Sequence, residues 1–258
     1  MKIDDFYEIG ELYCKSPRFL SKLQVAINLC EKELENHCSP YVALSGGKDS
    51  GVLAYVVNEA AKRVGRDYSI WSHVSDASFP GTVETVDKIA ETLGRTVDYY
   101  ESSCSAMGTL AERRQQRKFG KSGVFYDSVR AYARDKDLSF VGVRAFESKR
   151  RMKVAKIKGQ VFHSKSMGDI DVCYPLLWFK LEDIAAATVL FDVPLHPIYD
   201  KQPVDMGKNA NGEDYFIRLG YITSRDLLDK GTAVFLKLNY PDIFAKLQAV
   251  YHDIGRNL

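Results

Sequence analysis

Cysteine is scarce in this chain of 258 residues, and the few that occur are scattered. Their number is odd, no two of them form a Cys-x-x-Cys pair, and none follows Cys173. They are Cys14, Cys30, Cys38, Cys104 and Cys173. A disulfide framework needs a denser and even set, so this pattern indicates reduced thiols and predicts a cytoplasmic location.

Long apolar runs and an excess of one charge are missing as well. No stretch approaches the roughly 20 residues that a membrane-spanning helix needs. The N-terminal sequence MKIDDFYEIGELYC brings acids where a signal peptide has its apolar core. Membrane insertion and secretion are therefore not expected. Because 36 Lys and Arg balance 34 Asp and Glu, a histone-like wrap is not supported, and any basic surface must be local.

What the sequence does contain is a regular alternation of short apolar runs and helical patterns. The expected strands are 41–44, 68–74, 96–100, 138–143 and 171–176, and the expected helices between and after them are 51–65, 81–93 and 181–190. Such alternation predicts an α/β fold, an open and mostly parallel twisted sheet with helices on both faces.

The chain divides into three segments around this alternation. Residues 1–38 form an N-terminal helical segment built on an amphipathic helix, and residues 39–200 form the sheet domain. Residues 201–258 begin with a polar loop, DMGKNANGED, and continue as a helical extension with helices at 224–230 and 241–254. No repeat and no low-complexity segment interrupts this order.

The first expected strand runs directly into a glycine-rich loop that opens a helix. The loop reads Ser45, Gly46, Gly47, Lys48, Asp49 and Ser50. Two glycines let backbone N–H groups approach an anion, the helix start adds its positive dipole end, and the serine hydroxyls add donors, which together form a phosphate cradle. Lys48 can place a charge on a phosphate oxygen, and Asp49 can hold Mg²⁺ or cap the helix. The alternative is a plain glycine turn with a helix cap, and neither a Walker loop nor a dinucleotide fingerprint is present.

Positive charge concentrates between residues 144 and 158, where RAFESKRRMKVAKIK carries Glu147 as its single acid. Arg144 ends an expected strand, and its guanidinium can fork onto phosphate or sulfate oxygens, with a surface ion pair as the alternative. Of Arg150 and Arg151, we expect one to reach the ligand and the other to face water, and Arg150 is assigned to the ligand. The lysines of this segment favour an anionic substrate and leave nucleic acid open as a partner.

The loop from Ser45 to Ser50 resembles the PP-loop of the ATP pyrophosphatase superfamily, the adenine nucleotide α-hydrolases. Three further stretches are similar to its phosphoadenosine phosphosulfate (PAPS) reductase branch. They are 73–82 (HVSDASFPGT), 141–150 (VGVRAFESKR) and 175–199, which opens on PLLW and closes on PLHPIY. Together they cover roughly residues 40 to 225 in the family's order, which short motifs rarely achieve by chance.

The resemblance implies a Rossmann-like adenine nucleotide α-hydrolase fold, enzymatic activity and an adenine nucleotide ligand: ATP, PAPS or adenylyl sulfate. It implies catalytic roles for Lys48, Asp49 and Arg144, with Mg²⁺ beside Asp49. Asp76 would hydrogen-bond the nucleotide, and a turn cap is its alternative role. Phe79 would pack on adenine, and a place in the core is the alternative for this side chain.

The chain departs from the reductases at the positions where they carry cysteines. In the stretch LGYITS, Tyr221 and Ser224 stand where the family often has cysteine, and the C-terminal tail has none. Reduction through an enzyme S-sulfocysteine is therefore not expected, and no iron–sulfur cluster is expected either. Gly81 also stands where the family usually has glutamate.

The expected function is therefore a PAPS reductase-like protein that binds ATP and cleaves it between the α- and β-phosphates to adenylylate an acceptor. The acceptor would belong to sulfur metabolism or nucleic-acid modification. Two alternatives stay open: a PAPS reductase or sulfotransfer enzyme that uses external thiols, and a non-catalytic nucleotide sensor within a complex. A nucleic acid, guided also by a basic helix around Arg113 and Arg117, a protein partner and a homodimer stay open as partners.

Overall fold

A six-stranded sheet forms the centre of the computed structural model, which describes residues 2–76, 78–101, 124–201 and 232–250. Its strands are β1 (Pro40–Ala43), β2 (Ser69–Val74), β3 (Val97–Glu101), β4 (Leu138–Val141), β5 (Val161–Ser164) and β6 (Ile170–Cys173). Their order is β3-β2-β1-β4-β6-β5, and all neighbours are parallel except the antiparallel pair β5 and β6. The sheet confirms the expected open, mostly parallel α/β fold.

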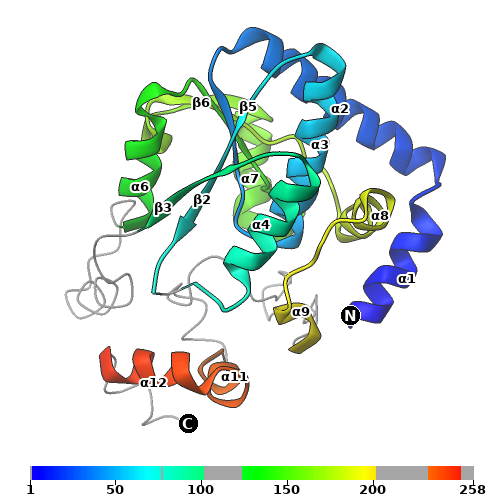
Figure 1. Cartoon of the computed structure of the whole chain (residues 1–258). Helices are drawn as coiled ribbons and strands as arrows, with labels where there is room; N and C mark the ends of the chain where they lie inside the picture. Colours follow the sequence, from blue (N-terminus) through cyan, green and yellow to red (C-terminus); the bar gives the residue numbers. More distant parts are fainter. Residues whose placement is uncertain (1, 77, 102–123, 202–231, 251–258) are drawn as a thin grey trace.

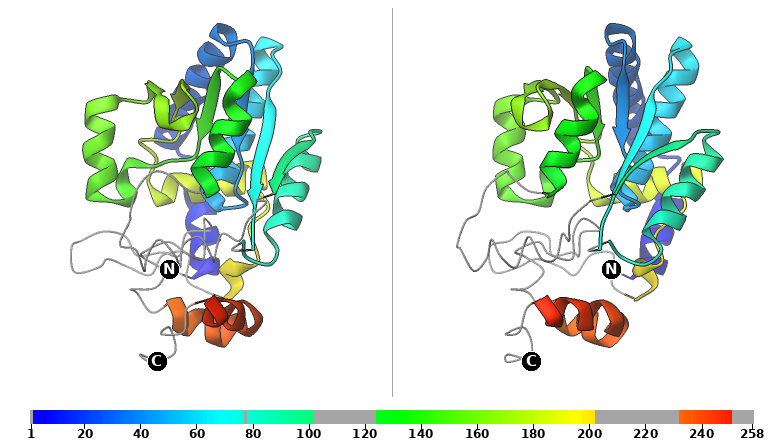
Figure 2. Two further views of the ribbon diagram at one scale, coloured as in Figure 1. Left: turned by 90° about the vertical axis from the view of Figure 1, so that its left-hand side faces the viewer. Right: turned by 60° about the vertical axis from the view of Figure 1, so that its left-hand side comes forward.

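Helices cover both faces of the sheet, with α2 and α3 on one side and α6 on the other (Figure 1 and Figure 2). The longer helices are α1 (Ile3–Tyr13), α2 (Pro17–Asn36), α3 (Lys48–Val64), α4 (Thr82–Thr92), α6 (Val124–Tyr132), α7 (Lys149–Lys158), α8 (Leu181–Phe191), α11 (Thr232–Asn239) and α12 (Pro241–Val250). Short turns are η1 (Ala133–Asp135), η2 (Ala145–Glu147), η3 (Lys165–Met167) and α9 (Ile198–Lys201). Helices α11 and α12 lie beneath the edge at which the parallel strands end (Figure 1).

Successive side chains of β1 enter two different apolar clusters. Val42 belongs to the main core, which contains residues of α2, α3, α4 and α8, whereas Tyr41 belongs to a second cluster with Trp71 and with Val129 of α6. Side chains of a strand point alternately to opposite faces of a sheet. Both faces of β1 are therefore buried, which explains why this strand reads as a continuous apolar run.

The N-terminal helices are part of the main core. Helix α1 crosses α8 at Gly10, where a Cβ atom would lie 2.5 Å from Val189 Cγ2 and 2.6 Å from the Ala185 carbonyl oxygen. Phe6 of α1 and Phe19 of α2 are fully buried in the cluster that also holds α3 and α8. The boundary at residue 38 between the first two sequence segments stays a prediction. Residues on both sides of this boundary belong to the main core.

The sequence signal was weakest for α7 and β5. Helix α7 carries basic residues at most of its positions and buries Ala155 alone, so it lacks the apolar periodicity by which helices are recognised. Strand β5 is four residues long and lies at the edge of the sheet. The expected strand 171–176 ends early, at Cys173, and Pro175 beyond it has no N–H for a sheet ladder.

Several sequence expectations concern parts of the chain outside the described residues. These are the polar loop DMGKNANGED, the helix at 224–230, the basic helix around Arg113, and the positions of Tyr221 and Ser224. The helix expected at 241–254 corresponds to α12. Among the helices that the structure describes, none has both the length and the apolar character of a membrane span.

Candidate functional site

The glycine-rich loop connects the end of β1 to the first turn of α3, as expected. Gly46 has a φ of +74°, a left-handed conformation that glycine adopts without strain, and a Cβ atom there would lie 3.3 Å from the Thr82 carbonyl oxygen. Gly47 is the N-cap residue of α3, so the helix begins at Lys48. The N-terminal N–H groups of α3 therefore open toward the loop, where a phosphate would find donors and the positive end of the helix dipole.

The two serine hydroxyls of the loop hold each other. Ser45 Oγ lies 3.0 Å from Ser50 Oγ, which accepts a hydrogen bond from the Ser45 N–H at 3.2 Å and donates to the Gly47 carbonyl at 3.0 Å. These hydrogen bonds join the first residue of the loop, Ser45, to the last, Ser50. The serines therefore fix the loop's shape, and this use of their hydroxyls is one that the sequence did not suggest.

Three charged side chains converge at the start of α3. Lys48 and Arg144 are 4% and 2% exposed, and both contact Asp49. Lys48 Nζ lies 2.8 Å from Asp49 Oδ2, and Arg144 Nε donates to Asp49 Oδ1. The structure thus brings the three expected catalytic residues together. Arg144 is in a buried ion pair, not in the surface pair that was its alternative role.

The two cations keep Asp49 ionised. Burial alone would raise its pKa, but the charges of Arg144 and Lys48 and their hydrogen bonds outweigh burial and hold the pKa of this carboxyl well below its ordinary value. Both carboxylate oxygens therefore face cations, which leaves a poor site for Mg²⁺. Elsewhere in the described part of the chain, no group of three or more His, Cys, Asp or Glu side chains converges as metal ligands would. The assignment of Mg²⁺ to Asp49 stays a prediction that this geometry does not favour.

Arg144 reaches the loop because β4 lies next to β1. The two strands pair in parallel, with Ala43 opposite Val141, so the residues that follow them meet at one edge of the sheet. Gly142, directly after β4, touches the start of α3: a Cβ atom there would lie 3.0 Å from the Asp49 carbonyl carbon and oxygen and 3.1 Å from Ser50 Cα. Glycine at this position allows the close approach that carries Arg144 to Asp49.

Tyr199, the last residue of the stretch PLHPIY, is a further part of the site. Its hydroxyl accepts a hydrogen bond from the Lys48 N–H at 3.3 Å, although it lies 151 residues away in the chain. Burial raises the pKa of this hydroxyl, so it keeps its proton at neutral pH. The side chain occupies one of the free N–H groups of α3 that a phosphate would otherwise use.

His196 ties a second part of the chain to the loop. The Ile198 N–H donates to His196 Nδ1 at 3.0 Å, so Nε2 carries the proton and donates to Thr82 Oγ1 at 3.2 Å. Burial lowers the pKa of His196 to about 4, and Glu84 opposes this only in part. The neutral ring therefore fixes Thr82, whose carbonyl packs on Gly46.

Replacing His196 with glutamine is expected to flatten the dependence of stability on pH. The folded-state pKa, about 4, lies below the unfolded value of about 6.5, so the unfolded state takes up the proton first as the pH falls. The contribution of His196 is complete above pH ~6.5 and is lost as the pH falls to about 4, by at most about 3 kcal/mol. Urea unfolding at pH 7.5 and at pH 4.5 measures it.

The comparison with the glutamine variant isolates His196, because His73 has a similarly lowered pKa of about 4 and titrates in both proteins. Glutamine can still donate to Thr82 but does not titrate in this range. An equal loss of stability in both proteins between the two pH values would contradict the assigned role of His196.

The remaining expected ligand residues are one buried aromatic and two exposed charged side chains. Phe79 is 2% exposed and packs edge-to-face on Tyr240 of the α11–α12 connection, with ring centroids 5.5 Å apart, which is the core position named as its alternative. Asp76 is exposed in the turn after β2, and Arg150 is exposed on α7. Gly81, the departure from the family's usual glutamate, has a φ of +90° and packs on Pro197, which favours glycine.

Arg151 binds a buried carboxylate. It forms an ion pair with Glu147, which is 5% exposed and also accepts a hydrogen bond from the Arg144 N–H at 3.2 Å. Ser148 caps α7 by accepting from the Arg151 N–H at 3.1 Å. Arg151 therefore supports the backbone of Arg144, a role that the Glu147 to Arg151 spacing of four residues could have indicated.

Similar solved structures share this fold at low sequence identity. The U34-tRNA thiolase NcsA from Methanococcus maripaludis has a TM-score of 0.56 and 15% identity, over 93% of this chain and 80% of its own. NMN synthetase from Francisella tularensis has a TM-score of 0.50 and 15% identity, over 92% and 94%. Candida glabrata FMN adenylyltransferase, in complex with FMN and the ATP analogue AMPCPP, has a TM-score of 0.50 and 16% identity, over 83% and 74%.

One of these structures corrects an expectation. NcsA is described with its [4Fe-4S] cluster, so the expectation that this chain holds no iron–sulfur cluster is wrong as a deduction from its cysteines. That deduction considered only the positions at which reductases place their cysteines, and a protein of the same fold holds a cluster. Of the five cysteines here, Cys14, Cys30 and Cys173 are buried, Cys38 is exposed, and Cys104 lies outside the described residues.

A search of curated proteins finds no match. The remaining comparison is with models of protein families. The model for the phosphoadenosine phosphosulfate reductase domain matches residues 39–253. That range starts at the strand before the glycine-rich loop and includes Arg144, His196 and Tyr199. With the loop, its charged cluster and the sheet all inside the match, the chain belongs to the PAPS reductase domain family of PP-loop proteins.

Proposed function

We propose that this protein binds ATP at the start of α3 and cleaves it between the α- and β-phosphates, transferring the adenylyl group to an acceptor. The observation that carries the proposal is the buried cluster of Lys48, Asp49 and Arg144 beside the glycine-rich loop. Two cations and a row of helix N–H groups share one edge of the sheet. That arrangement suits a ligand with several adjacent negative charges.

The chemistry asked of these residues is positioning and charge stabilisation. An acceptor oxygen attacks the α-phosphorus, the bond from that phosphorus to the bridging oxygen breaks, and pyrophosphate leaves with the electron pair. Lys48, Arg144 and the N–H groups of the loop would hold the negative charge that grows on the phosphate oxygens. No side-chain nucleophile is required, because the acceptor itself attacks.

Asp49 sets the condition under which the ligand binds. It forms ion pairs with the buried side chains of Lys48 and Arg144, and a counter-charge of this kind lowers the cost of burying a cation. Phosphate oxygens must therefore take over one or both cations from this carboxylate. A triphosphate, with its higher charge, competes for them better than a single phosphate group does.

The fold comparisons agree with a nucleotide-using enzyme of this kind. FMN adenylyltransferase, one of the similar structures, was determined with FMN and an ATP analogue, and NMN synthetase shares the fold over nearly its whole length. These proteins support an adenylyl-transferring role for the present chain.

Calorimetry and pyrophosphate release together test the proposal. The purified protein would be titrated with ATP, AMP, PAPS and adenylyl sulfate, and pyrophosphate would be measured in the presence of sulfate, a flavin, tRNA or DNA as acceptor. We expect ATP to bind more tightly than AMP and pyrophosphate to appear with one acceptor class. Preference for PAPS over ATP would instead favour a reductase or sulfotransfer enzyme that uses external thiols. ATP binding without pyrophosphate release would favour a nucleotide sensor.

A further inference from the structure

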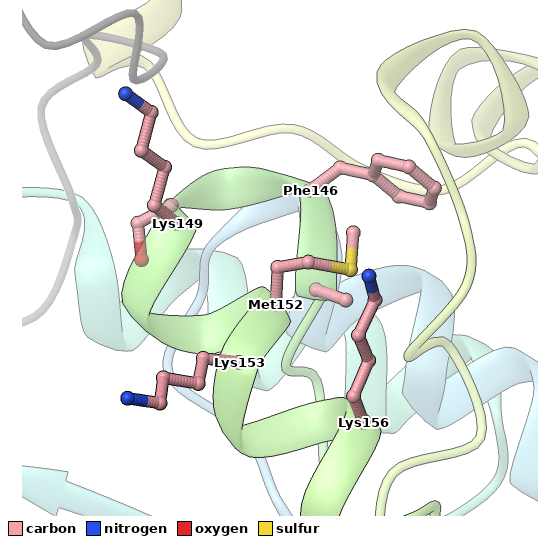
Figure 3. A pocket seen from close by; sticks show the side chains of 7 residues that line it. Phe146, Lys149, Met152, Lys153 and Lys156 are labelled. Carbon is pink, nitrogen blue, oxygen red and sulfur yellow. The ribbon is translucent and has the colours of Figure 1, made fainter.

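A pocket lies between η2 and α7, directly after Arg144. Its volume is about 490 Å³, which is within the range of small-ligand sites. Figure 3 shows the Phe146 ring, the Met152 thioether and the Lys156 ammonium group gathered on one side of α7, with Lys149 and Lys153 extending on the other. The lining consists of Ala145, Phe146, Ser148, Lys149, Met152, Lys153 and Lys156.

The apolar part of the pocket offers an open aromatic face. Phe146 is 40% exposed. Met152, which packs beside the small cluster of Ala145, Ala155 and Leu177, forms the floor near it. A flat π-system can therefore stack on the Phe146 ring, in a place where the thioether adds a polarisable contact.

The charged part of the pocket is a row of three lysines along α7. Lys149, Lys153 and Lys156 follow one another at spacings of four and three along α7, and all three line the pocket. All three are exposed, and within the described ranges no carboxylate forms an ion pair with any of them. Arg151 of the same helix, by contrast, is paired with Glu147. The lysine row is available to an external polyanion.

We propose that this pocket binds an unpaired nucleotide of a single-stranded nucleic acid, with the base stacked on Phe146 and the neighbouring phosphates on Lys149, Lys153 and Lys156. Stacking on aromatic side chains together with a basic track is how proteins hold single strands. A duplex keeps its bases stacked inside and would leave Phe146 unused. The carboxylate side chains of an acidic peptide would meet the lysines but cannot stack on the Phe146 ring.

The inference deepens the proposed function by naming the acceptor class, and for that chemistry it rests on the proposed function. Ala145 and Phe146 follow Arg144 directly in the chain. A base held in the pocket therefore brings its strand next to the cluster at which ATP is proposed to bind. Binding of the strand is a separate property and can be measured without ATP.

Fluorescence anisotropy with labelled oligonucleotides tests the binding surface. Single strands of about 12 nucleotides, within the site sizes of known single-strand binders, would be prepared as RNA and as DNA of one mixed sequence, with the matching duplex for comparison. We expect Phe146→Ala to weaken single-strand binding by between about fivefold and 150-fold. Phe146→Leu should also lose affinity, because it keeps apolar contact but removes stacking. Tighter binding of RNA than of DNA would identify the 2′-hydroxyl as a contact.

The lysine row has its own readout and a matched control. The triple variant Lys149→Ala, Lys153→Ala, Lys156→Ala should lower the slope of log affinity against log salt by about 2, since each phosphate contact on a single strand contributes about 0.7. The control triple variant Lys32→Ala, Lys62→Ala, Lys88→Ala removes equal charge from exposed lysines of α2, α3 and α4 and should keep the slope. Tyr7→Ala, at an equally exposed aromatic position, should leave affinity unchanged.

Four outcomes would overturn the inference. They are binding of the duplex as tight as that of the single strand, no effect of Phe146→Ala, equal weakening by both triple variants, and displacement of the oligonucleotide by a polyglutamate peptide at comparable concentration. Loss of ATP affinity in Phe146→Ala would assign the pocket to the mononucleotide instead. If oligonucleotides bind as expected while ATP does not, the proposed function fails and the nucleic-acid surface stands; the reverse pattern leaves the proposed function standing.

Discussion

Replacing Arg144 with alanine is expected to weaken ATP binding by about 100-fold. A charge-assisted hydrogen bond to a buried group contributes about 1.5–3 kcal/mol, and Arg144 lies at 2% exposure beside the loop. In this variant Lys48 is the remaining cation of the cluster beside Asp49. Asp49 then holds Lys48 more firmly and keeps its ammonium group away from a phosphate. Calorimetric titration with ATP measures the loss.

Stability must be followed in the same variant, since removing one member of a buried ion pair costs about 3–5 kcal/mol. Arg144→Lys keeps the charge and should remain folded, with ATP affinity lowered by about tenfold because the planar fork is lost. Lys48→Ala should weaken ATP binding by between about tenfold and 100-fold. A folded Arg144→Lys and a folded Lys48→Ala that both bind ATP like the original protein would refute the site.

The matched control is Arg63→Ala. Arg63 is also an arginine paired with carboxylates, Glu59 and Glu31, but it lies on the surface of α3, where its side chain is 39% exposed. Exposed pairs of this kind contribute about 0–1 kcal/mol to stability. This variant should keep both the stability and the ATP affinity of the original protein, so a loss there would mean that any arginine removal disturbs the fold.

The second large effect is expected from Gly142→Ala. The added Cβ atom would lie 3.0 Å from the Asp49 carbonyl group and 3.1 Å from Ser50 Cα, and these are backbone atoms of the helix start, which cannot move aside like a side chain. Overpacking of this kind costs about 1–3 kcal/mol. It also pushes β4 away from α3, and with it Arg144 from Asp49. We expect loss of ATP binding at a temperature at which the variant is still folded.

Gly51→Ala separates this effect from that of an added methyl group alone. A Cβ atom at Gly51 would lie 3.0 Å from Val193 Cγ1 and 3.4 Å from Ile89 Cδ1, which are ends of flexible side chains. Alanine also favours the helix at this position by up to ~1 kcal/mol. Thermal unfolding and calorimetry on both variants give the comparison, and equal behaviour of the two would show that the contact of Gly142 with the loop is unimportant.

The local part of the site could be predicted from sequence because its signal is local. The loop from Ser45 to Ser50 carries its own turn glycines and helix start, so its position between β1 and α3 follows from a few neighbouring residues. The pair of Arg144 and Asp49 depends on a long-range fact, that β4 lies beside β1 in the sheet. Alternation of strands and helices indicates a parallel sheet but does not fix the order of its strands.

Other contacts could not be predicted because they join distant segments. Tyr199 reaches the Lys48 N–H and His196 reaches Thr82 only once the chain after α8 has folded back over the loop. The burial of Phe79 depends on Tyr240. Helix α7 gave no apolar periodicity, because its exposed face is used for charge and its buried face is a single alanine. A helix whose residues are mostly exposed lacks the apolar periodicity by which helices are recognised in a sequence.

The crossing of α1 and α8 at Gly10 affects how this protein can be produced in pieces. The family match starts at residue 39, and a fragment cut there would look like a complete domain by homology. It would nevertheless lack Phe6, Phe19 and Leu23, which are buried against α3 and α8. The faces of α3 and α8 that these side chains cover would then be exposed apolar surface, which is prone to aggregation. A fragment for crystallisation or binding studies should therefore retain the chain from α1 onward.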